Sequence, residues 1–158
     1  YQCDWSSDVC SSDLLPAAAL GSTYLESDEQ GRTQFAKSFV TTVAITEGLK
    51  YSVHETRPNG SSRSFPSGHT SVAFQSATFL QERYGSEWGI PAYALASLVA
   101  DSRVHEKEHY WKDVVAGGLI GFGASHYFTT HVAGLKQAWI VPGVAHHGMS
   151  LSLWAPLD

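Results

Sequence analysis

The sequence predicts an all-α protein: one helical bundle followed by a short C-terminal extended tail. Two observations support this prediction. Apolar residues recur at helical spacing in several segments, and these segments are bounded by residues that favour helix ends. The stretch Met149–Trp154 instead alternates between apolar and polar residues, as a short strand does. A chain of 158 residues fits a single domain with a real core.

Five helical segments are expected along the chain. The first is short, and its visible part could be the end of a longer helix. Ser27 or Asp28 can cap the second helix, and Pro58 lies beyond its end. Gly85 is a stop signal for the third. The expected segments, in order, are Leu15–Leu20, Asp28 to about Val53, Ser67–Gly85, Pro91 to about Ser102, and about His109 to His131.

The last of these segments is rich in glycine, which weakens a helix by about 1 kcal/mol per residue. Its four glycines, Gly117, Gly118, Gly121 and Gly123, are tolerable if a neighbouring helix packs closely against them. We therefore expect a close helix–helix contact on this face. The Met149–Trp154 strand needs a partner, which the chain could supply near Val141.

The composition is that of an ordinary globular protein, with 43% hydrophobic and 16% charged residues. A net charge of −5 gives no reason to expect nucleic-acid binding. No apolar run reaches the roughly 18 residues needed to span a bilayer. These features suit a soluble protein or one in peripheral contact with a membrane.

The first 14 residues differ in style from the rest. Asp8–Leu14 reads DVCSSDL, which matches the translation of the end of a common short-read sequencing adapter. We predict that residues 1–14 are non-native and disordered, and that residues 15–158 form one domain that is truncated at its N-terminus. Both cysteines, Cys3 and Cys10, lie in the excluded segment, so they are no guide to redox compartment or metal binding.

Two segments contain groups suited to an oxyanion such as phosphate. Lys50 and Arg57 are seven residues apart, about two helical turns, so their cationic side chains can share a face. Next comes Pro66-Ser67-Gly68-His69 at a predicted helix start, where unpaired backbone N–H groups attract anions. Taken separately, the two cations could be solvated surface residues, and His69 could be incidental to a capped helix.

The third segment contains Arg103, His109 and Asp113. At i, i+4 spacing on a helix, the Asp113 carboxylate can fix the His109 tautomer and leave its other nitrogen free to attack. The His109–Asp113 pair could instead be an ordinary surface ion pair. A more specific alternative is a metal site formed by His105, His109 and Asp113. A metal site would leave Lys50, Arg57 and Arg103 unexplained, so we predict no metal.

Together the three segments are much more specific. The pattern Lys50-x6-Arg57-Pro58, Pro66-Ser67-Gly68-His69, Ser102-Arg103-x5-His109-x3-Asp113 resembles the three-part signature of the type 2 phosphatidic acid phosphatase and vanadium haloperoxidase superfamily. The resemblance covers roughly residues 29–131. It implies a helical bundle of the acid phosphatase/vanadium haloperoxidase type in which the three segments converge.

The resemblance also implies residue roles in a phosphatase that needs no metal or other cofactor. His109 is the nucleophile that becomes phosphohistidine, Asp113 orients it, and His69 is the general acid and base. The phosphoryl oxygens are held by Lys50, Arg57, Ser67, Gly68 and Arg103. Vanadate, a phosphate mimic, is expected to inhibit.

Several alternatives stay open at this point. The substrate could be a lipid phosphate, a lipid pyrophosphate or a small phosphomonoester, and the sequence does not give the oligomeric state. Two other functions stay open. The protein could be a vanadate-dependent haloperoxidase on the same scaffold, or a non-catalytic binder of phosphate or phospholipid. The resemblance implies a location outside the cytoplasm, in the periplasm or associated with a membrane.

Overall fold

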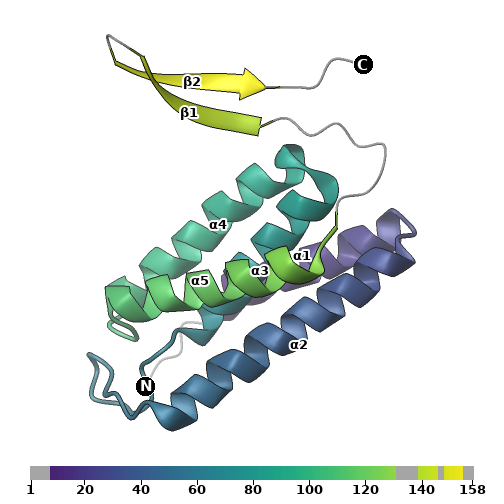
Figure 1. Cartoon of the computed structure of the whole chain (residues 1–158). Coiled ribbons are helices and arrows are strands. Elements are labelled where there is room, and N and C mark those ends of the chain that lie inside the picture. The colour runs from purple at the N-terminus through teal and green to yellow at the C-terminus, as the bar shows by residue number, and fades with distance from the viewer. Residues whose placement is uncertain (1–7, 131–138, 146–147, 155–158) are drawn as a thin grey trace.

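The computed structural model describes residues 8–130, 139–145 and 148–154. Five α-helices form a bundle, followed in the chain by a two-stranded hairpin (Figure 1). The predicted all-α bundle with a short extended tail is therefore confirmed. The elements are α1 (Asp8–Leu25), α2 (Glu29–Ser52), α3 (Gly68–Tyr84), α4 (Ser86–His105), α5 (Trp111–Phe128), β1 (Trp139–Ala145) and β2 (Gly148–Trp154).

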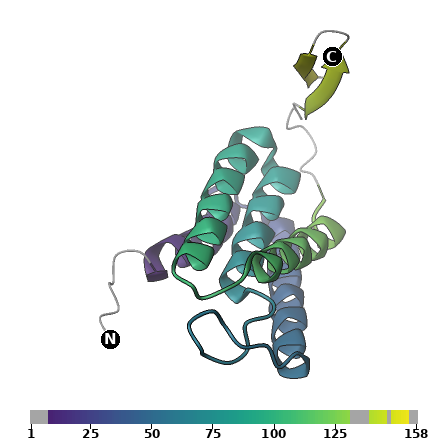
Figure 2. The same ribbon diagram turned by 90° about the vertical axis from the view of Figure 1, so that its left-hand side faces the viewer.

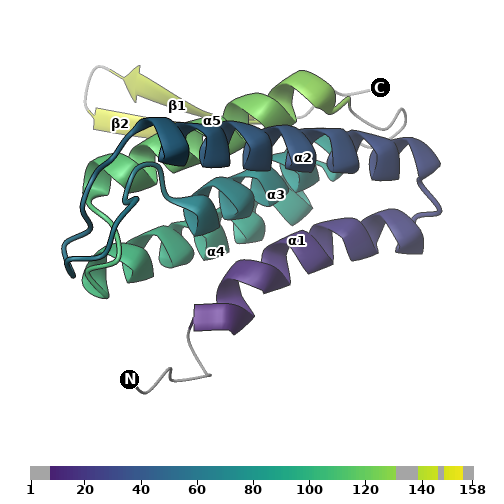
Figure 3. The ribbon, with the colours of Figure 1, turned by 90° about the horizontal axis from the view of Figure 1, so that it is seen from below.

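Helix α3 is the centre of the bundle and contacts each of the other four helices (Figures 2 and 3). Its apolar face packs in one cluster with α1, α2 and α4, and Phe35 of α2 meets Phe79 edge-on at a ring-centroid distance of 5.2 Å. The α2–α3 contact is otherwise polar and buried. Gln75 donates to Ser38 Oγ at 2.8 Å, and Thr46 donates to Ser71 Oγ at 3.1 Å. These hydrogen bonds satisfy groups that would otherwise be costly to bury.

Helix α5 lies against α3 at unusually close range through two of its glycines. A Cβ atom on Gly121 would lie 2.0 Å from the Ser71 carbonyl oxygen, and one on Gly117 would lie 2.5 Å from that of Ser67. The predicted close contact on the glycine face is therefore confirmed for these two positions. Gly123 has open space around its Cβ position, so it does not take part.

The helix ends agree with the sequence in some places and differ in others. Asp28 caps α2 by accepting from Gly31 N at 2.8 Å, and Gly85, with φ of 91°, ends α3 as predicted. Helix α4 begins at Ser86 rather than at Pro91, because Gly85 also serves as its N-cap and the chain turns at once. Helix α5 begins at Trp111 and ends at Phe128, so it is shorter than predicted and excludes His109.

Residues 8–14 are helical and continuous with Leu15 in α1, so the predicted disorder does not hold for them. Residues 1–7 lie outside the described residues. No helix in the described part of the chain is both long enough and apolar enough to cross a bilayer. The hairpin confirms the predicted strand, since β1 and β2 pair antiparallel with Val141 opposite Ser152.

A buried ion pair joins the start of α2 to the end of α3. Arg83 donates from Nε and Nη2 to the two Asp28 carboxylate oxygens, both at 2.6 Å, and the side chains are only 5% and 10% exposed. Arg83 also donates to the Thr130 carbonyl at 2.6 Å, which secures the chain after α5. The hydrogen bond from Arg83 is the main cause that lowers the pKa of Asp28.

We expect Asp28→Asn to lower the free energy of unfolding by about 3 kcal/mol, because the helix cap is kept but the buried Arg83 loses its counter-charge. A group with a lowered pKa stabilises fully above its unfolded-state value, here near 3.8, and loses that contribution as the pH falls through its folded-state value. Thermal melts should therefore show a stability difference from wild type that is constant near neutral pH and shrinks below about pH 4. Arg32→Ala is the control. Its ion pair with the exposed Glu29 should contribute less than about 1 kcal/mol.

Candidate active site

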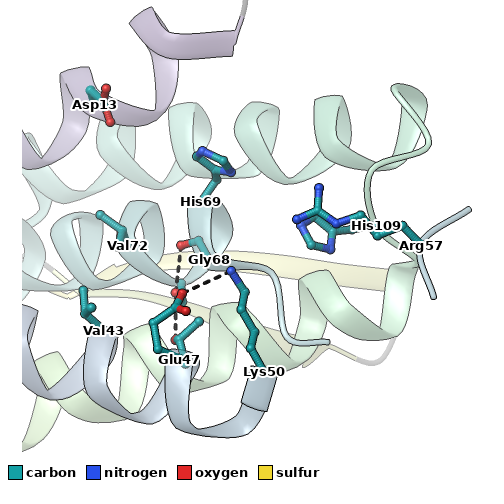
Figure 4. Close-up of a pocket in the computed structure, with 11 residues that line it drawn as sticks. Asp13, Val43, Glu47, Lys50, Arg57, Gly68, His69, Val72 and His109 are labelled. Atoms are coloured by element: carbon teal, nitrogen blue, oxygen red, sulfur yellow. Dashed lines mark hydrogen bonds and ion pairs between the residues drawn. The ribbon is translucent and has the colours of Figure 1, made fainter. Parts of the chain in front are cut away.

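A cavity of about 250 Å³ lies where α2 ends and α3 begins. Its polar lining includes Lys50 from α2, Arg57 from the following loop, Gly68 and His69 from α3, and His109 from the loop before α5 (Figure 4). These are members of all three predicted segments. Residues far apart in the sequence therefore meet at one small cavity of a size suited to a phosphoryl group.

Each predicted cation has a carboxylate partner in this structure. Lys50 Nζ lies 3.2 Å from Glu47, and Arg103 Nη2 lies 2.9 Å from Glu106. Arg57 pairs through Nη1 with Glu108, while its buried Nε has no hydrogen-bond partner. Arg103 is buried and does not line the cavity, although its charge acts on His69.

The start of α3 presents its backbone to the cavity. Gly68 allows close approach, since a Cβ there would lie 3.1 Å from Lys50 Nζ. Ser67 is the N-cap, as predicted, but its buried hydroxyl pairs with Thr70 at 2.9 Å and does not line the cavity. Its backbone N donates to the Asp113 carbonyl at 3.0 Å, which fixes α3 to the first turn of α5.

The His109–Asp113 pair is close but differs from the prediction. His109 precedes α5 instead of lying on it, and its Nδ1 is 3.7 Å from Asp113 Oδ2, beyond hydrogen-bond distance. Asp113 Oδ2 accepts from Ser64 Oγ and, at 3.0 Å, from Tyr110 N, since Asp113 forms a capping box at the start of α5. His109 Nδ1 and Asp113 Oδ1 are both buried without partners.

The two histidines of the cavity favour their neutral forms. Burial, and then the nearby Arg57 cation, lower the pKa of His109 to about 4, against the opposing effect of Asp113. Burial of the ring lowers the pKa of His69, and the positive charges of Arg103 and Lys50 lower it further. A neutral imidazole is the form that can act as a nucleophile.

The proposed metal alternative finds no support in the geometry. His105 is 75% exposed and pairs with Asp101, whereas His109 is buried. Across residues 13–130, where the structure describes the side chains, no group of three or more His, Cys, Asp or Glu could hold a metal ion.

The sequence analysis missed several residues of the site. Asp13 of α1 and Glu47 of α2 line the cavity, and two further residues, Ser64 and Glu108, hold the residues of the pattern. Ser64 donates to the Asp113 carboxylate, and Glu108 accepts from Arg57. Neither stands at a position of the three-part pattern, and Ser64 sits in a polar loop with nothing to distinguish it from its neighbours. Glu108 is adjacent to His109 in the sequence, but its pairing with Arg57 depends on the fold.

Comparison with known proteins decides the family. The profile described as the PAP2 superfamily matches residues 32–147. The chain belongs to the PAP2 superfamily. Among curated PAP2 relatives, it is 38% identical over 76 residues to lipid A 1-phosphatase of Porphyromonas gingivalis and 40% identical over 73 residues to lipid phosphate phosphatase 1 of Arabidopsis thaliana. The matched segments cover 46% and 37% of this chain, but only 17% and 22% of those relatives.

Solved structures confirm the PAP2 fold. The crystal structure of Aquifex aeolicus LpxE superposes with a TM-score of 0.61 at 20% identity, over 73% of this chain and 81% of that one. The first transmembrane PAP2 type phosphatidylglycerolphosphate phosphatase from Bacillus subtilis superposes with a TM-score of 0.50 at 25% identity, over 80% and 78%. None of these comparisons supports an adapter origin for residues 1–14.

Proposed function

We propose that this chain is the catalytic domain of a phosphatase that hydrolyses lipid phosphate monoesters through a phosphohistidine, without a metal ion. One observation carries the proposal: a neutral histidine, a second histidine, two cations and a helix N-terminus line one cavity of about 250 Å³. Phosphoryl transfer requires positioning and compensation of charge on the phosphoryl oxygens, which fixed cations and backbone N–H groups can provide.

In the first step, His109 attacks phosphorus. Since Nδ1 faces Asp113, the attacking atom is Nε2. The P–N bond forms as the bond from phosphorus to the leaving oxygen breaks, and protonated His69 gives that oxygen its proton. The negative charge of the bound phosphate opposes the effect of Lys50 and Arg103 on His69, and so favours its protonated form. Asp113 balances the positive charge that develops on His109.

In the second step, water attacks phosphorus from the side opposite His109. His69, now neutral, takes a proton from the water, and the P–N bond breaks to return inorganic phosphate and free His109. Lys50, Arg57 and Gly68 line the cavity. In both steps the two cations and the Gly68 N–H hold the phosphoryl oxygens. Ser67 and Arg103 do not line the cavity and act indirectly. Ser67 fixes the start of α3, and Arg103 contributes its positive charge.

The outer surface supports a lipid substrate and contact with a membrane. A stripe of large apolar side chains on α5, spaced as one helix face, is between 44% and 66% exposed: Trp111, Val115, Leu119 and Phe122. It borders an apolar groove of about 810 Å³ between α3, α4 and α5. The α2–α3 contact contains buried Ser, Thr and Gln side chains instead. Polar contacts between helices, with large apolar groups outside, are typical of bundles in contact with lipid.

The names of the relatives agree with this substrate class, since one acts on lipid A and the other on lipid phosphates. We propose that the domain works at a membrane surface outside the cytoplasm, as the resemblance implies. Cell fractionation with an accessibility label would test the location separately from the activity.

A substrate panel tests the reaction. The purified chain should release phosphate from p-nitrophenyl phosphate and, with higher kcat/KM, from phosphatidic acid in mixed micelles. EDTA should leave both rates unchanged, and vanadate should inhibit both competitively. Undecaprenyl pyrophosphate is included to separate monoester from pyrophosphate hydrolysis. Absence of phosphate release from every substrate, or peroxide-dependent bromide oxidation with vanadate in its place, would contradict the proposal.

A further inference from the structure

The loop that carries Arg57 is joined to the loop that carries His109 through two residues outside the three-part pattern. Arg57 Nη1 donates to Glu108 Oε2, and Asn59 Nδ2 donates to the other carboxylate oxygen, Oε1, at 2.9 Å. Asn59 N also donates to the Lys107 carbonyl at 3.1 Å. Glu108 therefore bridges two loops that are about 50 residues apart in the sequence and directly precedes the proposed nucleophile.

Asn59 is itself held in the orientation that this bridge needs. Its Oδ1 accepts from Ser61 N at 3.0 Å, within the turn that follows Arg57. With the oxygen engaged there, the NH₂ group is directed to Glu108. Both oxygens of the Glu108 carboxylate are thus occupied, and the carboxylate is fixed on two sides.

The bridge leaves part of the Arg57 guanidinium available. Nη1 is taken by Glu108, whereas Nε is buried beside the cavity without a partner. Figure 4 shows Arg57 and His109 next to each other. A guanidinium fixed at one end by a carboxylate can present its remaining N–H groups to a phosphoryl oxygen with little further loss of freedom.

We propose that Glu108, supported by Asn59, is a positioning residue that holds Arg57 against His109 for the phosphoryl transfer proposed above. The inference rests on that proposed function. The alternative is a surface ion pair that only contributes to folding. Such a pair, with side chains 26% and 28% exposed, would contribute little to stability and nothing to the rate.

Three variants separate these readings by kcat/KM on p-nitrophenyl phosphate. Glu108→Ala should lower it about 100-fold, the effect of a misplaced catalytic group. Glu108→Gln keeps one of the two acceptor oxygens and should lower kcat/KM about tenfold. Asn59→Ala should lower kcat/KM about fivefold, which corresponds to the loss of one hydrogen bond. Glu87→Gln, an exposed change at the start of α4, should leave it unchanged. In an Arg57→Ala background, Glu108→Ala should add less than about twofold, because the residue it positions is gone.

The pH dependence of kcat/KM provides a second test, because the two readings predict shifts of the acidic limb in opposite directions. His109 faces Arg57, Asp113 and Lys50. It shares the cavity with His69, Asp13 and Glu47, and Arg103 is buried nearby. If Glu108 holds Arg57 in place, Glu108→Ala releases that cation, and the acidic limb of kcat/KM moves to higher pH. If Arg57 stays without it, loss of the carboxylate leaves a more positive site, and the limb moves to lower pH.

The outcomes distinguish this inference from the proposed function. No activity in the wild type would overturn the proposed function. If the wild type is active, any one of three results would overturn the role of Glu108. Glu108→Ala and Glu108→Gln could retain wild-type rates, or the effects of Glu108→Ala and Arg57→Ala could be additive. The third result is an acidic limb of Glu108→Ala at lower pH than that of the wild type. If Glu108→Ala fails to fold, Glu108→Gln, which preserves size, carries both measurements.

Discussion

His109→Ala is expected to abolish phosphate release, with kcat reduced by more than about 10³-fold, because the proposed phosphohistidine forms on this side chain. The side chain is 2% exposed and neutral near pH 7, so its removal deletes the proposed nucleophile without removing a surface charge. Steady-state phosphate release measures the loss. Rapid quenching of the wild type into alkaline denaturant should also trap phosphate on His109, since a P–N bond is broken by acid.

His105→Ala is the matched control, four residues away. Its imidazole is 75% exposed and pairs with Asp101, so we expect wild-type activity. Equal loss in His105→Ala together with inhibition by EDTA would instead favour the metal site considered from the sequence. Retained activity in His109→Ala would exclude the covalent route.

The sequence predicted the features that depend on local chemistry. Asp28 at a helix start and Gly85 at a helix end act within one turn of their own helix, so composition and spacing were sufficient for them. Two of the four glycines predicted to pack closely, Gly117 and Gly121, do so, because glycine at this density inside a helix is unfavourable unless a neighbour needs the space. The three-part pattern brought together Lys50, Arg57 and His109, which line one cavity with Gly68 and His69 although they are far apart in the sequence. It gave no sign of Asp13 or Glu47, which line the same cavity.

What the sequence did not predict depends on contacts between distant loops. His109 was placed on a helix with Asp113, but Asp113 instead caps α5 through Tyr110, so the helix begins two residues after His109. Tyrosine is not a residue that marks an N-cap, and the boundary gave no signal. Ser64 and Glu108 acquire their partners only when the loop after α2 folds against the loop before α5.

A large loss of stability is expected for Gly121→Ala. The added methyl group would lie 2.0 Å from the Ser71 carbonyl oxygen and 2.7 Å from Gln75 N, both backbone atoms of the central helix. Backbone cannot move aside as a side chain can, so α5 must shift away from α3. We expect a loss of about 3 kcal/mol, seen as a fall in Tm of about 10 °C in a thermal melt.

Gly123→Ala, two residues along the same helix, separates this contact from helix propensity. Nothing lies within 4 Å of its added methyl group, so the change should stabilise α5 by up to about 1 kcal/mol. Opposite signs for the two variants would show that the α3–α5 contact governs stability at Gly121, whereas a gain at both would contradict it. The same contact bears on the site, because the Ser67 N–H donates to the Asp113 carbonyl at the end of α5 nearest the cavity. A shifted α5 would carry Asp113 away from His109, so Gly121→Ala should also lower kcat at temperatures where the variant is still folded, and Gly123→Ala should not.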